Sequence, residues 1–351
     1  MGPTEPLTLR GIAARVVFVP LGVASHFARG VVARARLGTL HQRPTVFRCV
    51  AERPRARPAG PAGGRLRVYA VITHVVPPVD RLPAEAAAQY LARFQSCLDG
   101  LFRAFAHCDL TVEVNTYAGR HLLDRLPAYA AARVRACEHA TGDPTRLEFH
   151  GHEMIAAAAD RHDWFLFLED DVVLHDPCFL EKLDLFNRAA ADPSLVLMPH
   201  LYEMSQGRKV YVQRAARDGR VNPYSAHTAI HAPGVTFVEF ENPHAAMFCL
   251  SQAQVRRWAA SGRRWRGRTV WVGHNESACT GCLFECFRLY KPHPRHAHFL
   301  EAQHWGEKYA TIYQGWDAAA GRPHDTLRPG TTDGAPVAPL RLVLGDGNAA
   351  R

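Results

Sequence analysis

The apolar positions of the chain fall into short runs and helical stripes, which predict alternating strands and helices. Five consecutive apolar residues, Trp164–Leu168, lead directly into three consecutive acids, and apolar residues resume at once. A short unbroken apolar run of this kind predicts a strand buried on both faces of a sheet. The β-branched segment 66–73 predicts an earlier strand, and residues 84–106 carry an apolar stripe at helical spacing.

The order of the remaining segments indicates the class of fold. Further strands are expected at 110–116, 195–198, 235–241, 245–250 and 288–292, and further helices at 147–161, 176–190 and 275–287. Ser251 and Gln254 match a capping box and predict one more helix start. Because strands and helices alternate, we expect an α/β fold with a mixed, mainly parallel sheet flanked by helices.

Charge divides the chain into parts. Residues 1–64 are expected to form a basic, poorly ordered leader and linker, 65–314 the folded body, and 315–351 a flexible tail. Eleven arginines stand against two acids in the first 65 residues, and the remaining 31 basic and 31 acidic residues balance. A balanced body does not suggest a nucleic-acid surface. The leader suits either a peripheral contact with an anionic membrane or a solvated extension.

The cysteines and the early residues bear on localisation. No apolar run approaches the ~18 residues that span a bilayer, and no secretory signal is clear at the N-terminus. The nine cysteines are odd in number and lie mostly in apolar or helical contexts, as buried free thiols do. We therefore expect a cytoplasmic protein, with contact at the inner membrane face if the leader binds there.

Glu169, Asp170 and Asp171 carry the strongest chemical signal. Adjacent carboxylates repel one another unless a cation or hydrogen-bond donors compensate them. They follow a buried strand, and open α/β sheets bind ligands at the carboxyl ends of their strands. Hard oxygen ligands suit Mg²⁺ or Mn²⁺, which bridge substrate phosphates. The sequence thus predicts a metal site for a phosphorylated substrate, with a plain acidic turn as the alternative.

The segment 164–172, Trp-Phe-Leu-Phe-Leu-Glu-Asp-Asp-Val, resembles the acidic DxD signature of GT-A glycosyltransferases. Glu169 and Asp171 stand at its two acidic positions, and the order of elements over about 66–312 is similar to that family. The resemblance implies a GT-A-like fold with a Rossmann-like nucleotide-binding half and an acceptor half. It also implies a nucleotide-diphosphate sugar donor and a divalent metal. Because the first position is Glu rather than Asp, Asp171 is the favoured direct ligand and Glu169 the second.

The same resemblance implies roles for residues elsewhere in the chain. In GT-A enzymes that invert the anomeric centre, a carboxylate at the start of a late helix is the general base, which here is Glu276. A helix N-terminus favours its ionised form; the alternative is that Glu276 only stabilises the helix end. A C-terminal histidine completes the metal sphere in many members, which implies His304 first and His298 second.

The donor site follows from the first strand. In the family this strand borders the nucleotide, which implies Thr73 and His74, while Glu169 and Asp170 help Asp171 at the diphosphate. Reserve candidates are Glu203 and Glu241 for the base, and Arg208 and Lys209 for the diphosphate.

These inferences favour a glycosyltransferase that moves a sugar from a nucleotide-diphosphate donor to a glycan, lipid-linked or small-molecule acceptor. A metal-dependent nucleotidyl- or phosphotransferase and an inactive sugar-binding module of the same fold are the alternatives. Residues 73–78, after the first strand, contain no glycine or lysine for a phosphate-binding loop, which disfavours the nucleotidyltransferase.

Overall fold

A computed structural model describes most of the chain between residues 64 and 323. The described ranges are 64–140, 146–212, 224–240, 243–261, 273–284, 286–312, 316–317 and 322–323. The basic leader, the reserve residue Glu241 and nearly all of the predicted tail lie outside them. In these ranges no helix combines the length and the apolar character that crossing a membrane requires.

The central sheet is built around β4 (Trp164–Glu169) and β1 (Arg67–Thr73). In the described residues it has the order β11-β4-β1-β2-β3, with β2 at Asp109–Tyr117, β3 at Val134–His139 and β11 at Met247–Ser251. The strands β4, β1, β2 and β3 are parallel, and β11 pairs antiparallel with β4. The predicted mixed, mainly parallel α/β sheet is therefore confirmed.

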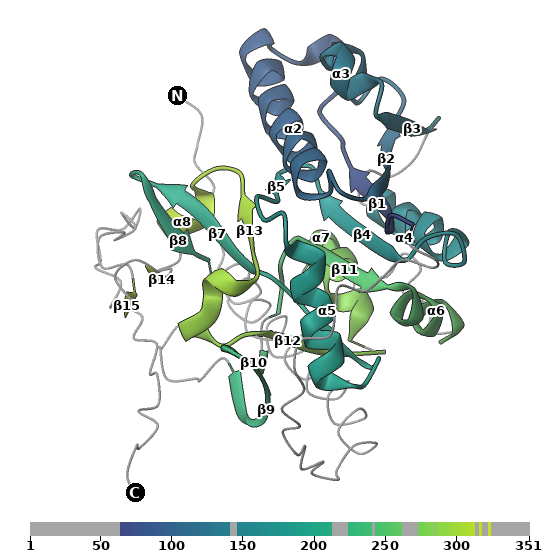
Figure 1. The fold of residues 1–351 in the computed structure, drawn as a ribbon. Coiled ribbons are helices and arrows are strands. Elements are labelled where there is room, and N and C mark those ends of the chain that lie inside the picture. The colour runs from purple at the N-terminus through teal and green to yellow at the C-terminus, as the bar shows by residue number, and fades with distance from the viewer. Residues whose placement is uncertain are drawn as a thin grey trace, which may run out of the picture.

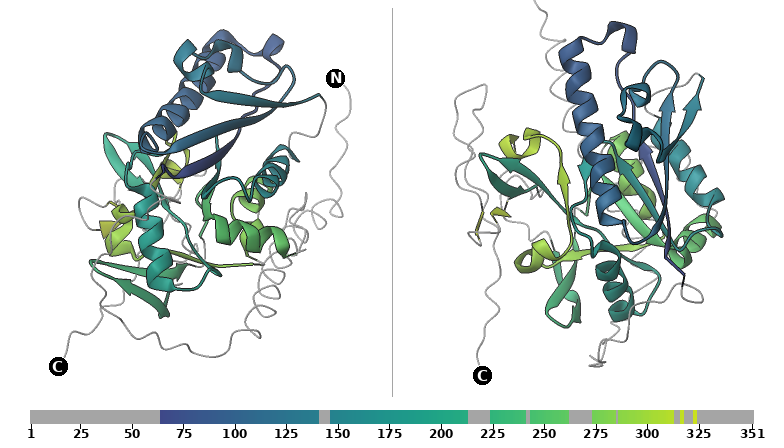
Figure 2. Two further views of the ribbon diagram at one scale, coloured as in Figure 1. Left: turned by 45° about the vertical axis from the view of Figure 1, so that its right-hand side comes forward. Right: turned by 45° about the horizontal axis from the view of Figure 1, so that its top comes forward.

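Helices cover this sheet on both faces (Figures 1 and 2). The long helix α2 (Ala84–Ala104) connects β1 to β2, whereas α4 (Leu147–Ala157) returns the chain from β3 to β4 on the other side of β1. The connection from β1 to β2 and the connection from β3 to β4 run toward opposite edges of the sheet. Because such connections are right-handed, their helices lie on opposite faces. Gly151 of α4 permits close packing, since a Cβ there would lie 2.6 Å from the Phe167 ring.

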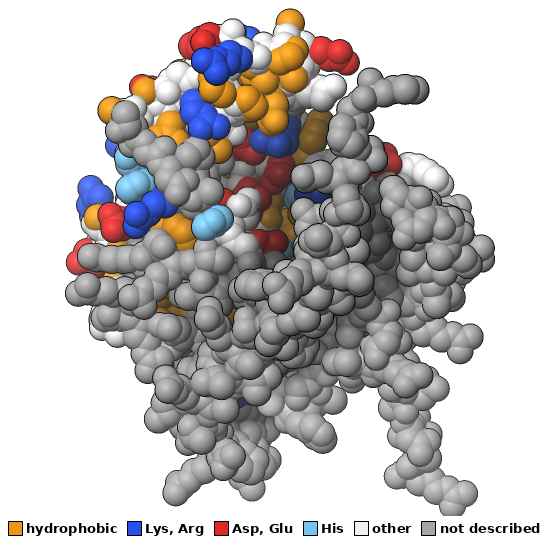
Figure 3. All heavy atoms as spheres, turned by 180° about the vertical axis from the view of Figure 1, so that it is seen from behind, with side chains coloured by type: hydrophobic (Ala, Val, Ile, Leu, Met, Phe, Trp, Pro, Cys, Tyr) orange, Lys and Arg blue, Asp and Glu red, His pale blue; other side chains and the backbone are white. Residues whose placement is uncertain are grey.

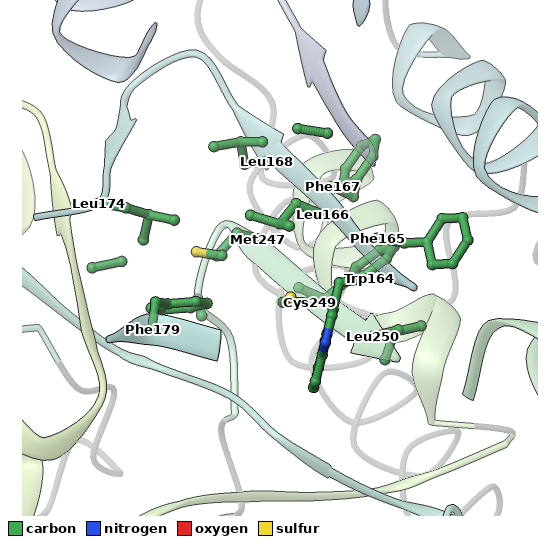
Figure 4. Close-up of a cluster of buried hydrophobic side chains, with 14 of the residues drawn as sticks. Trp164, Phe165, Leu166, Phe167, Leu168, Leu174, Phe179, Met247, Cys249 and Leu250 are labelled. Carbon is green, nitrogen blue, oxygen red and sulfur yellow. The ribbon is translucent and has the colours of Figure 1, made fainter. Parts of the chain in front are cut away.

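The hydrophobic core surrounds β4, whose residues Trp164–Leu168 are all buried. Figure 4 shows apolar side chains of β4 and β11 beside Leu174 and Phe179, the first residue of α5 (Phe179–Ala190). The prediction of a strand buried on both faces is thus correct. Burying five large apolar side chains contributes about 1.5–3 kcal/mol for each one that is fully buried, which explains why this run anchors the domain.

Two further sheets complete the described fold. The second has the order β6-β12-β10-β9, and the third has the order β15-β14-β8-β7-β13-β5. Their strands are β5 Val172–Val173, β6 Leu195–Leu197, β7 His200–Ser205, β8 Arg208–Tyr211, β9 Tyr224–Ala232, β10 Val235–Phe240, β12 Arg288–Pro292, β13 Glu301–His304, β14 Trp316–Asp317 and β15 Arg322–Pro323. Since β14 pairs with β8, the sheet continues past residue 314, where the body was predicted to end.

Short helices link these strands. They are α3 Ala128–Ala131, α6 Gln252–Ala260, α7 His274–Cys279 and α8 Lys308–Ile312, with 3₁₀ turns at Val79–Arg81, Leu123–Arg125, Gly281–Leu283 and Pro294–Phe299. The capping box of Ser251 and Gln254 is present at the start of α6, as predicted. The helix predicted over 275–287 is shorter in the structure, where α7 ends at Cys279. The cysteines of the described residues are free and mostly buried, in line with the sequence.

Candidate active site

The acidic triplet lies where the strand order of the central sheet reverses. From β1 the chain proceeds to β2 and β3 on one side and then crosses to β4 on the other. Ligands of open α/β sheets bind at such a point, beyond the carboxyl ends of the strands. In the register of β1 and β4, Thr73 is paired with Glu169, so the end of β1 adjoins the triplet. The Thr73 hydroxyl is buried and has no hydrogen-bond partner within the described structure.

Asp170 is held from two sides. Its Oδ2 lies 2.6 Å from Nδ1 of His74, and its Oδ1 lies 2.6 Å from Nη2 of Arg93. The backbone N–H of Leu122 donates to Nε2 of His74, so the ring proton is on Nδ1 and is donated to Asp170. Burial raises the pKa of Asp170, but the His74 hydrogen bond and the Arg93 charge outweigh burial and hold that pKa below its usual range.

His74 thereby serves a different purpose from the one predicted. The ring is fully buried and stacks on Phe94 with centroids 4.1 Å apart. Both of its nitrogens are engaged, by Asp170 and Leu122. It therefore anchors the middle acid, and a direct contact between this ring and a nucleotide does not fit the geometry.

Asp171 faces His304. Nε2 of His304 lies 3.5 Å from Oδ2 of Asp171, and the N–H of Trp305 donates to the Asp171 carbonyl at 2.7 Å. Burial raises the pKa of the Asp171 carboxyl, against the charge of His304. Burial lowers the pKa of His304, but the hydrogen bond to Glu203 and the charge of Asp171 raise it above its ordinary value overall.

Glu169 is turned toward α7. Its Oε1 accepts a hydrogen bond from Sγ of Cys279 at 3.2 Å, and Asn275 also bonds to it. Burial, followed by the charges of Asp171 and Glu148, raises its pKa well above the usual range. Glu169 therefore differs from Asp171 in its partners, which are Cys279 and Asn275 of α7.

The predicted ligand set of Asp171, Glu169 and His304 is therefore only partly assembled. Across the described ranges, no group of three or more His, Cys, Asp or Glu side chains is arranged to hold a metal ion. The structure brings Asp171 and His304 together and leaves Glu169 with α7. His298, the second choice, lies exposed on the 3₁₀ turn that precedes β13.

Glu276 lies in the first turn of α7 and is half-buried. Its carboxyl folds back over the helix start, since a Cβ on Gly273 would lie 2.6 Å from Oε2 of Glu276. The nearby Glu148 of α4 is buried, and its Oε2 has no hydrogen-bond partner in the described structure. Burial and the charge of Glu276 raise the pKa of Glu148 to about 8. The predicted base thus has a protonated carboxyl near it at neutral pH.

Two of the reserve candidates, Glu203 and Lys209, have other partners. Glu203 is fully buried with both oxygens engaged, so it cannot serve as the base. Lys209 forms an ion pair with Glu301 and lies over the Tyr202 ring, which makes it part of the third sheet rather than a free phosphate ligand.

Two residues of the site had no role in the sequence interpretation. Arg93 stands on α2 beside the buried Phe94, and its pairing with Asp170 depends on contacts that span 77 residues of sequence. Glu148 did leave a signal, because it shares a helical face with His152 and Ile155, which are both buried. An acid on an apolar helical face indicates a buried carboxyl.

Figure 3 shows the molecule from behind, with acidic side chains gathered in a hollow and basic and histidine side chains beside them.

Comparisons with known proteins leave the function open. No family model and no curated protein matches the chain. Among solved structures it is similar to mannose-1-phosphate geranyltransferase from Thermus thermophilus, with 14% sequence identity. The match covers 64% of this chain and 73% of that chain, with a TM-score of 0.35. A likeness of this size assigns no activity.

Proposed function

We propose that this chain is a GT-A-like glycosyltransferase that transfers a sugar from a nucleotide-diphosphate donor to an acceptor hydroxyl. The observation that carries the proposal is the pairing of Asp171 with His304 at the reversal point of the sheet. The Asp171 carboxylate lies two residues beyond the end of the central strand, and an imidazole nitrogen of His304 lies 3.5 Å from it. This combination suits a metal-assisted reaction at a phosphate better than a plain acidic turn.

Asp171 and His304 fit a divalent cation such as Mn²⁺ or Mg²⁺. Oδ1 of Asp171 is buried without a hydrogen-bond partner in the described structure, and such an orphaned oxygen is satisfied by a cation. Oxygen and imidazole nitrogen suit Mn²⁺. Ions of this size are commonly held by one or two protein groups together with waters and substrate phosphates, so two ligands suffice. When bound, the cation would neutralise the diphosphate leaving group.

The other residues act on the substrates. The Thr73 hydroxyl, which has no hydrogen-bond partner in the described structure, is the donor proposed for the nucleotide half. Arg93, whose side chain is partly exposed, balances the charge of the acids. During transfer the acceptor oxygen forms a bond to the anomeric carbon, and the bond from that carbon to the diphosphate oxygen breaks. In an inverting reaction the acceptor proton passes to the Glu276 carboxylate.

The test is release of nucleoside diphosphate from a panel of UDP-, GDP- and ADP-sugars in the presence of Mn²⁺. The unmodified chain should release one nucleotide, and Asp171→Asn should abolish the Mn²⁺-dependent part. Asp160→Asn is the matched control, because Asp160 is an exposed acid whose ion pair with Arg256 lies at the surface.

Two results would overturn the proposal. One is the absence of release and of donor binding with every sugar nucleotide. The other is Asp171→Asn with unchanged release. Pyrophosphate formed from a nucleoside triphosphate and a sugar phosphate would instead identify a nucleotidyltransferase.

A further inference from the structure

We infer that Glu203 is a positioning residue that orients His304 toward the cation site, an inference that rests on the proposed function. Glu203 lies on β7 and is fully buried. Its Oε1 is 2.8 Å from Nδ1 of His304, and its Oε2 accepts the backbone N–H of Ala310 at 2.5 Å. Every described contact of this carboxylate therefore involves His304 or the helix α8 that follows it.

The hydrogen bond determines which ring nitrogen faces the site. An ionised carboxylate only accepts hydrogen bonds, so Nδ1 of His304 must be the donor. The neutral ring then has its lone pair on Nε2, the atom that lies 3.5 Å from Oδ2 of Asp171. Glu203 thus selects the tautomer in which His304 can bind a cation beside Asp171.

The strand order makes this orientation rigid. In the third sheet β13 lies between β7 and β5, and Gln303 is paired with Tyr202 on one side and with Val173 on the other. His304 is therefore held between the strand that carries Glu203 and the strand that begins directly after Asp171. The Tyr309 ring packs against the imidazole with centroids 5.1 Å apart.

The burial of the Glu203 carboxylate is not explained by fold stability alone. Burying a carboxylate costs desolvation free energy unless hydrogen bonds or opposite charges compensate it. An apolar side chain of similar volume often stabilises the fold equally well. Here the two oxygens hold the ring of His304 and the amide of Ala310, while Oδ1 of Asp171 is left without a partner among the described residues. That arrangement is the one expected when a carboxylate supports a metal-binding histidine from behind.

The experiment measures Mn²⁺ binding by electron paramagnetic resonance, with and without a nucleoside diphosphate, and compares Glu203→Gln with the unmodified chain. Loss of a carboxylate behind a ligating histidine weakens metal binding by about 10–100-fold, and we expect a change in that range. Glu301→Gln is the matched control: Glu301 lies on the same strand as His304 but bonds Lys209 and Tyr211.

A second measurement does not depend on any variant or on activity. Nitrogen-15 NMR of the histidine rings reports which nitrogen of the neutral His304 ring carries the proton, and we expect it on Nδ1. A proton on Nε2 overturns the inference. If Glu203→Gln does not fold, this tautomer measurement and the Mn²⁺ affinity of Glu203→Asp still decide the question, since the shorter acid should also bind more weakly.

The outcomes separate this inference from the proposed function. Mn²⁺ binding that is intact in the unmodified chain and equally strong in Glu203→Gln overturns the role of Glu203 alone. An unmodified chain that binds no Mn²⁺, with or without nucleotide, overturns both. Equal weakening in Glu203→Gln and Glu301→Gln points to a general loss of the third sheet and also counts against a specific role.

Discussion

Nδ1 of His74 donates a hydrogen bond to Oδ2 of Asp170 at 2.6 Å, which ties the middle acid of the triplet to the end of β1. Arg93 binds the other oxygen of the same carboxylate. The three consecutive acids are therefore not equivalent. Asp170 is a buried anchor, Glu169 is bonded to α7, and Asp171 is the acid that faces His304.

The first prediction concerns this anchor. Asp170→Ala leaves the His74 donor buried without this partner and removes the ion pair of the partly exposed Arg93. Leaving a buried donor unsatisfied costs about 1–3 kcal/mol of unfolding free energy. Urea denaturation measures the loss. Asp160→Ala, which removes an exposed ion pair with Arg256, should change the unfolding free energy little. Equal stability of the two variants would show that Asp170 does not anchor the fold.

The second prediction concerns the proposed base. Glu276→Gln should lower kcat about 10²–10⁴-fold, the range expected for loss of a general base. Affinity for the nucleoside diphosphate should stay unchanged, because Glu276 lies on α7 rather than beside Asp171. Glu153→Gln, at an exposed position of α4, is the control. Full kcat in Glu276→Gln would leave this acid only the role of stabilising the helix start.

The elements that local sequence determines were predicted closely. The strand β4 and the helix α6 follow from an apolar run and a capping box, both of which act within a few residues. The strand β3 was missed because it is a partly exposed edge strand without a clear apolar run. The pairing of β7 with β13 was missed because it joins segments about 100 residues apart, and no local pattern encodes such a contact.

The candidate site likewise combines features that local sequence predicts with features that only tertiary contacts determine. Asp171 could be proposed from the acidic motif and His304 from the resemblance to GT-A enzymes, and the structure places the two residues together. The engagement of His74 with Asp170, and that of Glu169 with Cys279, depends on which neighbours the fold supplies. Side-chain direction at the end of a strand is determined by tertiary packing, so the partners of the three adjacent acids could not be predicted from sequence.

The third prediction tests the packing of α4 on the sheet. Gly151→Ala should destabilise the fold by about 1–3 kcal/mol, because the added Cβ would lie 2.6 Å from the Phe167 ring and 3.1 Å from Val71. In a solvent-exposed helix Gly→Ala is stabilising. A loss of stability in Gly151→Ala would therefore indicate the close contact with Phe167. Phe167→Leu should relieve part of the clash, and a non-additive double mutant in thermal unfolding would reveal it. A gain of stability in Gly151→Ala would contradict the close approach.

The last prediction concerns the buried lysine of the second sheet. Burial lowers the pKa of Lys291 to about 7, and its Nζ donates to the His244 carbonyl at 2.9 Å. Between pH 10.5 and about 7 the unfolded chain takes up a proton that the folded chain does not. The unfolding free energy should therefore fall as pH decreases through this range and then level off. Lys291→Met should lack this component.

The measurement is the difference in unfolding free energy between the unmodified chain and Lys291→Met at several pH values from about 6 to about 10, a range that spans the expected change. Taking the difference removes the contribution of the tyrosines and cysteines, which titrate in both proteins. At neutral pH the variant loses the bond to the His244 carbonyl but no longer bears the cost of a buried ammonium, so its relative stability should be greatest at low pH. A difference that does not vary with pH would mean that the Lys291 ammonium keeps its ordinary pKa in the folded chain.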